Sequence, residues 1–86
     1  MTRYLLDTNV LLHLDNKLQG HELIAHQLTI NSPKQLFISA IGERDSMIAG
    51  IATVHDMDVV TDNVKEFARV PGILVYNWRE NVIRRI

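Results

Sequence analysis

Residues 4–12, YLLDTNVLL, combine an apolar run, a polar turn and the start of a helix. The apolar run lacks the alternation of a half-buried strand, which predicts a short, fully buried one. Thr8 or Asn9 can cap a helix that begins at Val10. Asp7 therefore stands at the carboxyl end of the first strand. Ligands of parallel α/β sheets collect at that edge, so Asp7 is the first candidate for a functional residue.

The rest of the chain repeats this alternation of strand and helix. Apolar runs and helical spacing predict strands over 36–41, 59–61 and 73–76, helices over 10–14, 21–28 and 45–54, a short helix after Asn63, and a tail after Trp78. Continuous apolar strands without hairpin dipeptides predict an α/β fold, a short parallel sheet of about four strands with helices on its faces. With 86 residues the chain is expected to form one domain, residues 1–86.

Composition narrows the function classes. A net charge of −1 and a pI near 6.4 argue against a protein that coats nucleic acid by charge alone. The absence of cysteine excludes disulfides and thiolate zinc sites. Neither an apolar run of membrane-spanning length nor a signal-type leader is recognisable, so we expect a cytoplasmic protein without a membrane partner.

Acidic residues gather at the same predicted edge of the sheet. Asp62 and Asn63 follow the third strand, and Asp45 opens the helix after the second strand, with Glu43 two residues earlier. Carboxylates brought together repel one another, and a cation is what usually makes such a group tolerable. Oxygen ligands without cysteine favour Mg²⁺ or Mn²⁺, which catalyse phosphodiester hydrolysis by activating water.

Simpler interpretations exist for each of these residues. Asp7, Asp45 and Asn63 can each cap or begin a helix, and Asp62 can be a solvated turn residue. His13, His21, His26 and His55 lack metal-ligand spacing and are expected to be surface or packing residues. No glycine-rich phosphate loop and no nucleophile-elbow sequence is present. The grouping of acids at one edge, rather than any single acid, indicates a metal site.

Several segments together resemble a PIN domain of the VapC toxin type. They are 4–11 as the opening strand with its Asp-Thr-Asn, 37–41 as the second strand, 42–50 as the Gly-x-x-Asp-x-x-Ile-Ala helix, 60–72 as the strand and loop of the fourth ligand, and 75–78. The resemblance implies a compact three-layer PIN-like fold and a Mg²⁺- or Mn²⁺-dependent endoribonuclease. It further implies a toxin neutralised by a VapB-like antitoxin, and a homodimer.

The resemblance also assigns roles to residues. Asp7, Asp45 and Asn63 would form the catalytic set; Asp7 and Asp45 would bind the metal, with Asp62 and Glu43 as further candidate ligands. Thr8, Asn9 and Thr61 would orient these ligands from behind. Arg44, Arg79 and Arg84 are candidates for RNA phosphate contacts, with solvated surface as the alternative for each.

One departure from the family pattern changes the expectation. Ile41 is joined directly to Gly42, where the family has several helices and a further acid, normally glutamate. Asp45 thus has the strand spacing of the second acid and the helix context of the third, and one side chain cannot hold both positions. The internally shortened chain can therefore be a catalytically impaired remnant that binds RNA, a protein partner or a second copy. The lost cover over the sheet predicts a dimer with an apolar interface.

A third interpretation is a phosphotransfer domain of the haloacid dehalogenase kind, which also begins from an aspartate at a strand end. That family usually has a second aspartate two residues later, where Asn9 stands here. The sequence disfavours it.

Overall fold

The computed structural model describes residues 2–39, 44–67 and 72–80, and the backbone of 82–85. Its strands are β1 (Tyr4–Leu6), β2 (Leu36–Ile38), β3 (Asp58–Val60), β4 (Leu74–Asn77) and β5 (Val82–Arg85). Its helices are α1 (Thr8–Asp15), α2 (His21–Ile30), α3 (Asp45–His55) and α4 (Val64–Phe67), with a 3₁₀ turn at Pro33–Gln35. The predicted elements thus all exist within the described residues, with ends that differ by a few residues.

The strands form one sheet in the order β2-β1-β3-β4-β5. β2, β1, β3 and β4 run parallel, which confirms the predicted parallel sheet of four strands. The expectation of a tail after Trp78 is wrong, because β5 turns back and pairs antiparallel with β4. Asn77 makes this reversal: its Oδ1 accepts the backbone N–H groups of Arg79 at 3.0 Å and of Glu80 at 3.1 Å.

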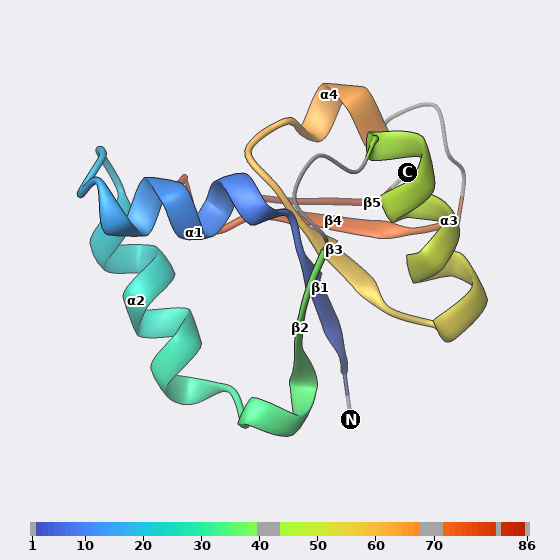
Figure 1. Ribbon diagram of the computed structural model, residues 1–86, viewed down its shortest axis with the longest axis horizontal. Helices are drawn as coiled ribbons and strands as arrows, with labels where there is room; N and C mark the ends of the chain where they lie inside the picture. The colour runs from blue at the N-terminus through green and yellow to red at the C-terminus, as the bar shows by residue number, and fades with distance from the viewer. Residues whose placement is uncertain (1, 40–43, 68–71, 81, 86) are drawn as a thin grey trace.

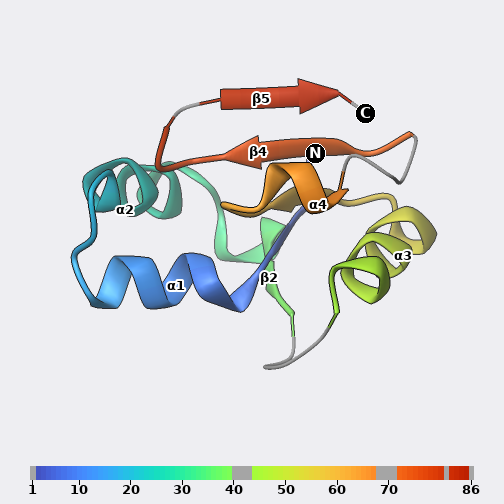
Figure 2. The ribbon, with the colours of Figure 1, turned by 90° about the horizontal axis from the view of Figure 1, so that it is seen from above.

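Helices cover both faces of the sheet, which gives the predicted three-layer α/β arrangement (Figure 1). Along β1, Leu5 and Leu6 point to opposite faces because successive side chains of a strand alternate. Leu5 belongs to the core cluster under α3 and α4, together with Phe67. Leu6 belongs to the cluster under α1 and α2, together with Ile24. In Figure 2, α1 and α2 lie at one side, α3 lies at the other, and α4 lies between them.

Helix α3 buries the stripe that its sequence predicts. Ile48, Ala49 and Ala52 are fully buried against the sheet. A second apolar stripe on this helix is left open: Met47 is 55% exposed and Val54 80% exposed, on either side of the half-buried Ile51. These three positions are spaced i, i+4 and i+7 and therefore share one face.

Strand β2 leaves apolar side chains uncovered at the edge of the sheet. Phe37 is 39% exposed and Ile38 59% exposed. Phe37, Ile38 and Ile51 line one shared hollow, which joins the strand to the helix. We call Phe37, Ile38, Met47, Ile51 and Val54 the β2–α3 patch. Four of these five side chains are exposed and Ile51 is half-buried.

The turn between α1 and α2 is anchored to the end of β4. Gly20 has a φ of +86°, a conformation that strains any residue with a Cβ. Its Cα faces the backbone carbonyl of Arg79, leaving no room for a side chain. The Arg79 guanidinium in turn donates through Nε to the carbonyl oxygen of Gln19 at 2.7 Å.

Two further points concern the helices. The N-cap of α1 is Asp7, not Thr8 or Asn9, because its carboxylate accepts the Asn9 N–H at 3.3 Å. In the described part of the chain, no helix has the length and apolar character that crossing a membrane requires.

Candidate functional site at the carboxyl ends of the parallel strands

Asp7 is a buried carboxylate held from two sides. It is 6% exposed. Its Oδ1 accepts the Asn9 N–H, and its Oδ2 accepts the hydroxyl of Thr61 at 3.1 Å across the β1–β3 pair. Thr61 is fully buried, and its Oγ1 also accepts the Asn63 N–H at 3.0 Å. One threonine thus fixes both Asp7 and the backbone at Asn63.

Ser39 and Thr8 lock the turn that carries Asp7. The Thr8 N–H donates to the Ser39 hydroxyl at 3.2 Å, and the Thr8 hydroxyl donates to the Ser39 carbonyl at 2.8 Å. Ser39 is buried and follows β2 directly. This pair joins the carboxyl ends of β1 and β2. The sequence offers Ser39 only as the serine of a Ser/His/Asp triad that no motif supports, and this positioning role was not predicted. Its place just past an apolar strand, level with Asp7, is the available signal.

Asp45 lies within electrostatic reach of Asp7. It is the first residue of α3 and is partly buried. Burial raises the pKa of Asp45, and the negative charges of Asp7 and Glu66 raise it further. Two acids from distant segments thus lie near enough for their charges to interact. A bound cation would relieve this repulsion.

Asp62 points instead toward a basic pair. Its Oδ2 accepts from Arg79 Nη1 at 3.2 Å and contacts Nδ1 of His13 on α1. Burial and the Arg79 charge lower the pKa of His13, which favours the neutral ring. His13 was expected to be a surface or packing residue. Its position four residues after Asn9, one helical turn along the same face, is the signal that places it beside this edge.

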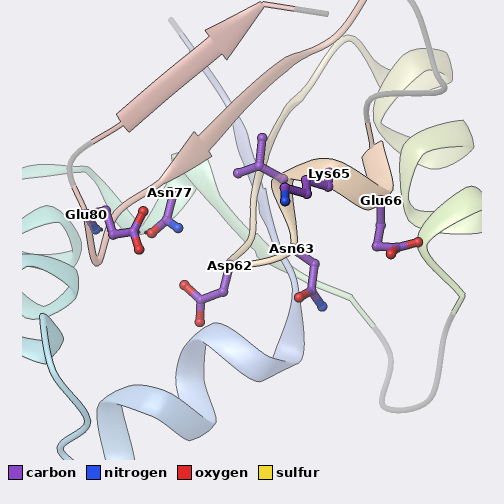
Figure 3. A pocket seen from close by; sticks show the side chains of 7 residues that line it. Asp62, Asn63, Lys65, Glu66, Asn77 and Glu80 are labelled. Carbon is purple, nitrogen blue, oxygen red and sulfur yellow. Dashed lines mark hydrogen bonds between the residues drawn. The ribbon is translucent and has the colours of Figure 1, made fainter.

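A hollow of about 350 Å³ opens between α4 and the end of β4 (Figure 3). Its lining consists of Asp62, Asn63, Val64, Lys65, Glu66, Asn77 and Glu80. Asn63, predicted for the fourth ligand position, lies in its wall. Glu66, at the α3 side, is the acid that, after Asp7, raises the pKa of Asp45 by its negative charge.

The remaining predicted residues are placed as follows. Glu43 lies outside the described residues. Arg44 is exposed and precedes α3. Arg79 is engaged with Asp62 and Gln19, and the backbone of Arg84 lies in β5. Of the arginines expected at RNA, Arg44 is the one whose described side chain is open to solvent.

The residues present suit a hard cation with few protein ligands. In residues 2–39, 44–67 and 72–80, no three histidine or acidic side chains gather closely enough to hold a metal ion. Asp7 and Asp45 would provide two carboxylates, and Asn63, in the wall of the hollow, would add an amide oxygen. Mg²⁺ commonly uses one or two carboxylates together with water and substrate phosphate, so this set fits Mg²⁺ or Mn²⁺ better than zinc.

Two curated proteins are similar to part of the chain. The "tRNA(fMet)-specific endonuclease VapC" of Salmonella typhimurium is 47% identical over 38 residues, 44% of this chain and 29% of that protein. The "Ribonuclease VapC2" of Rickettsia felis is 42% identical over 38 residues, 44% of this chain and 28% of that protein. The match thus spans less than a third of either relative. No protein-family model and no solved structure matches the chain significantly.

Proposed function

Because the chain is a partial relative of the VapC ribonucleases, we propose that it is a Mg²⁺- or Mn²⁺-dependent endoribonuclease, the toxin of a toxin–antitoxin pair. The observation that carries this proposal is the pairing of a buried, doubly held Asp7 with Asp45. Two carboxylates whose charges repel are tolerated more readily when a cation neutralises them. Such an arrangement is typical of a functional site.

The residues of the site would have separate roles in binding the metal and in positioning its ligands. A divalent cation, when bound, neutralises the acids and polarises a phosphodiester of the RNA. Asp7 and Asp45 would bind the cation through their carboxylates. Asn63, in the wall of the hollow, would be a further ligand through its amide oxygen. Thr61 fixes Oδ2 of Asp7, while Thr8 and Ser39 fix the turn, so that the carboxylate needs little reorganisation.

The test is Asp7→Asn assayed on a mixed-sequence RNA with and without Mn²⁺. Wild type should cleave the RNA only when the metal is present. The variant should cleave it at least about 100-fold more slowly, because an amide cannot supply the negative charge of the ligand. Asp15→Asn is the matched control, because Asp15 is an exposed acid at the end of α1. Cleavage that survives Asp7→Asn, or that needs no metal, contradicts the proposal.

A second candidate function is RNA or protein binding without catalysis, by an impaired remnant of such a nuclease. It is favoured by the two-acid site, since no third acid or histidine joins Asp7 and Asp45 within the described residues. Metal-independent RNA binding that Asp7→Asn leaves unchanged, with no cleavage by wild type, would establish this function in place of the first.

We extend the proposal to the partners and the compartment. The partners would be RNA, a VapB-like antitoxin and a second copy of this chain, and the compartment the cytoplasm. Support for the second copy comes from the β2–α3 patch, in which the side chain of Val54 is 80% exposed. Contiguous exposed apolar side chains mark interaction surfaces more often than free surface.

A further inference from the structure

Beyond Asn63, the residues that line the hollow, Lys65, Glu66, Asn77 and Glu80, have no role in the function proposed above. We propose that the hollow binds one unpaired base of the RNA, guanine in preference to the others, with Asn77 as the donor that recognises it. This inference rests on the proposed function, because it names the feature of the RNA that the acidic site would meet.

Asn77 is oriented by the backbone that surrounds it. The residue is 6% exposed, and its Oδ1 accepts two backbone N–H groups, those of Arg79 and Glu80. An amide has one oxygen and one NH₂ group, so fixing the oxygen also fixes the direction of the donor. Within the described residues Nδ2 makes no hydrogen bond, and the side chain lies in the wall of the hollow (Figure 3).

The charges of the lining select against a phosphate. Glu66 and Glu80 carry negative charges without an ion-pair partner among the described residues, against the single positive charge of Lys65. Asp62 is already balanced by Arg79. A hollow with this balance repels an anion and accepts a neutral group that offers N–H donors.

Among the bases, guanine matches the groups available. Its Watson–Crick edge carries an acceptor, O6, beside two donors, N1–H and the N2 amino group. Asn77 can donate to the acceptor, and the carboxylate of Glu80, on the same turn, can accept from the donors. Unpaired bases are commonly recognised through this edge. The volume of about 350 Å³ lies at the lower end of small-ligand sites, which suits a single base.

The experiment measures nucleoside binding by the full chain in EDTA, where cleavage is absent. Guanosine, inosine, adenosine, cytidine and uridine are titrated while amide signals are followed by ¹⁵N NMR, with inorganic phosphate as a separate titrant. Guanosine should bind most tightly and shift the side-chain NH₂ signals of Asn77. Inosine, which lacks the N2 amino group, should bind the same site more weakly than guanosine does.

The decisive variant is Asn77→Asp, which keeps an oxygen for the two backbone N–H groups, replaces the donor by a second acceptor oxygen and adds a negative charge. Its Kd for guanosine should rise about tenfold or more. Asn16→Asp makes the same change at the exposed end of α1 and should leave the Kd unaltered. If Asn77→Asp does not fold, Glu80→Gln at an exposed position serves instead, and it should abolish the preference for guanosine over inosine.

Equal binding of the five nucleosides, tighter binding of phosphate, or a guanosine Kd unchanged in the variant would overturn the inference. These outcomes are independent of the nuclease proposal. Metal-dependent cleavage without base preference refutes the base site alone. Guanosine binding without any cleavage refutes the nuclease alone.

Discussion

Hydroxyl side chains, rather than charged ones, position the central acid of this protein. Thr61 donates to Asp7, and Ser39 accepts from the backbone of Thr8 beside it. A neutral hydroxyl fixes the direction of a carboxylate without cancelling its charge, which an arginine in the same place would do. Asp7 is thereby held in place and still available to a cation.

Ser39→Ala tests how much this positioning contributes to stability. The variant leaves the Thr8 N–H without its described acceptor at a partly buried position, so the free energy of unfolding should fall by about 1–3 kcal/mol. Urea titration followed by circular dichroism measures the change. Ser46→Ala, at an exposed position of α3, should change it by less than about 0.5 kcal/mol. Equal effects of the two variants would contradict the assigned role.

Single residues of the site differ in how far the sequence predicts them. That Asp7 and Asp45 share an edge follows from their places after parallel strands, a rule of topology. His13 and Asn77 do not follow from such a rule. Their contacts depend on how α1 packs across the sheet and on the reversal after β4, and neither geometry is encoded in local spacing.

At the scale of elements, the α1–α2 turn depends on a glycine. Gly20→Ala would place a Cβ against the Arg79 carbonyl in a backbone conformation with φ of +86°, so we expect a loss of about 2–4 kcal/mol in unfolding free energy. Gly50→Ala is the matched change in the middle of α3, where nothing lies within 4 Å of the new Cβ. It should stabilise by about 0.5–1 kcal/mol. Thermal unfolding of both variants measures the contrast, and a tolerated Gly20→Ala would refute the close approach.

The contact between Tyr76 on β4 and Asp58 on β3 predicts that the stability of the fold declines at alkaline pH. Burial, the Asp58 charge, Tyr4 and the hydrogen bond that Tyr76 donates to Asp58 at 3.3 Å raise the pKa of Tyr76 to about 12. The folded form thus keeps a proton that the unfolded chain loses near pH 10. The contribution of Tyr76 is complete below about pH 10 and is lost as pH rises from there to about 12. Tyr76→Phe should remove this part of the decline, measured as the difference in Tm between wild type and variant across that range. Parallel curves would contradict it.

Strands and helices with apolar periodicity are the elements that the sequence predicts well. The stripe of Ile48, Ala49 and Ala52 is buried as expected, and the strands before Asp7 and Asp62 lie at the centre of the sheet. β5 is missed for a physical reason. Its turn is built by one asparagine side chain that caps two backbone N–H groups, and not by an Asn-Gly or Asp-Gly pair that would mark a hairpin.

At the scale of the whole molecule, the β2–α3 patch predicts self-association. We expect a dimer by light scattering at high protein concentration, and Val54→Lys should shift it to a monomer, because a charge cannot be buried at an apolar interface without a partner. Val54 is 80% exposed, so this change should not unfold the chain. Leu12→Lys, at a half-exposed position of α1, is the control that should remain dimeric. A wild-type protein that is monomeric at every concentration would refute the prediction.

The sheet order also sets the sequence of events in synthesis. β1 emerges first and ends with both its neighbours in place, the later β2 and β3. The hydroxyl that holds Asp7 belongs to a residue 54 positions further on, and the guanidinium that secures the α1–α2 turn donates to a carbonyl 60 positions earlier. A chain still growing on the ribosome therefore carries Asp7 without its support. The carboxylate of Asp7 is therefore fixed only after Thr61 has left the ribosome and β3 has paired with β1.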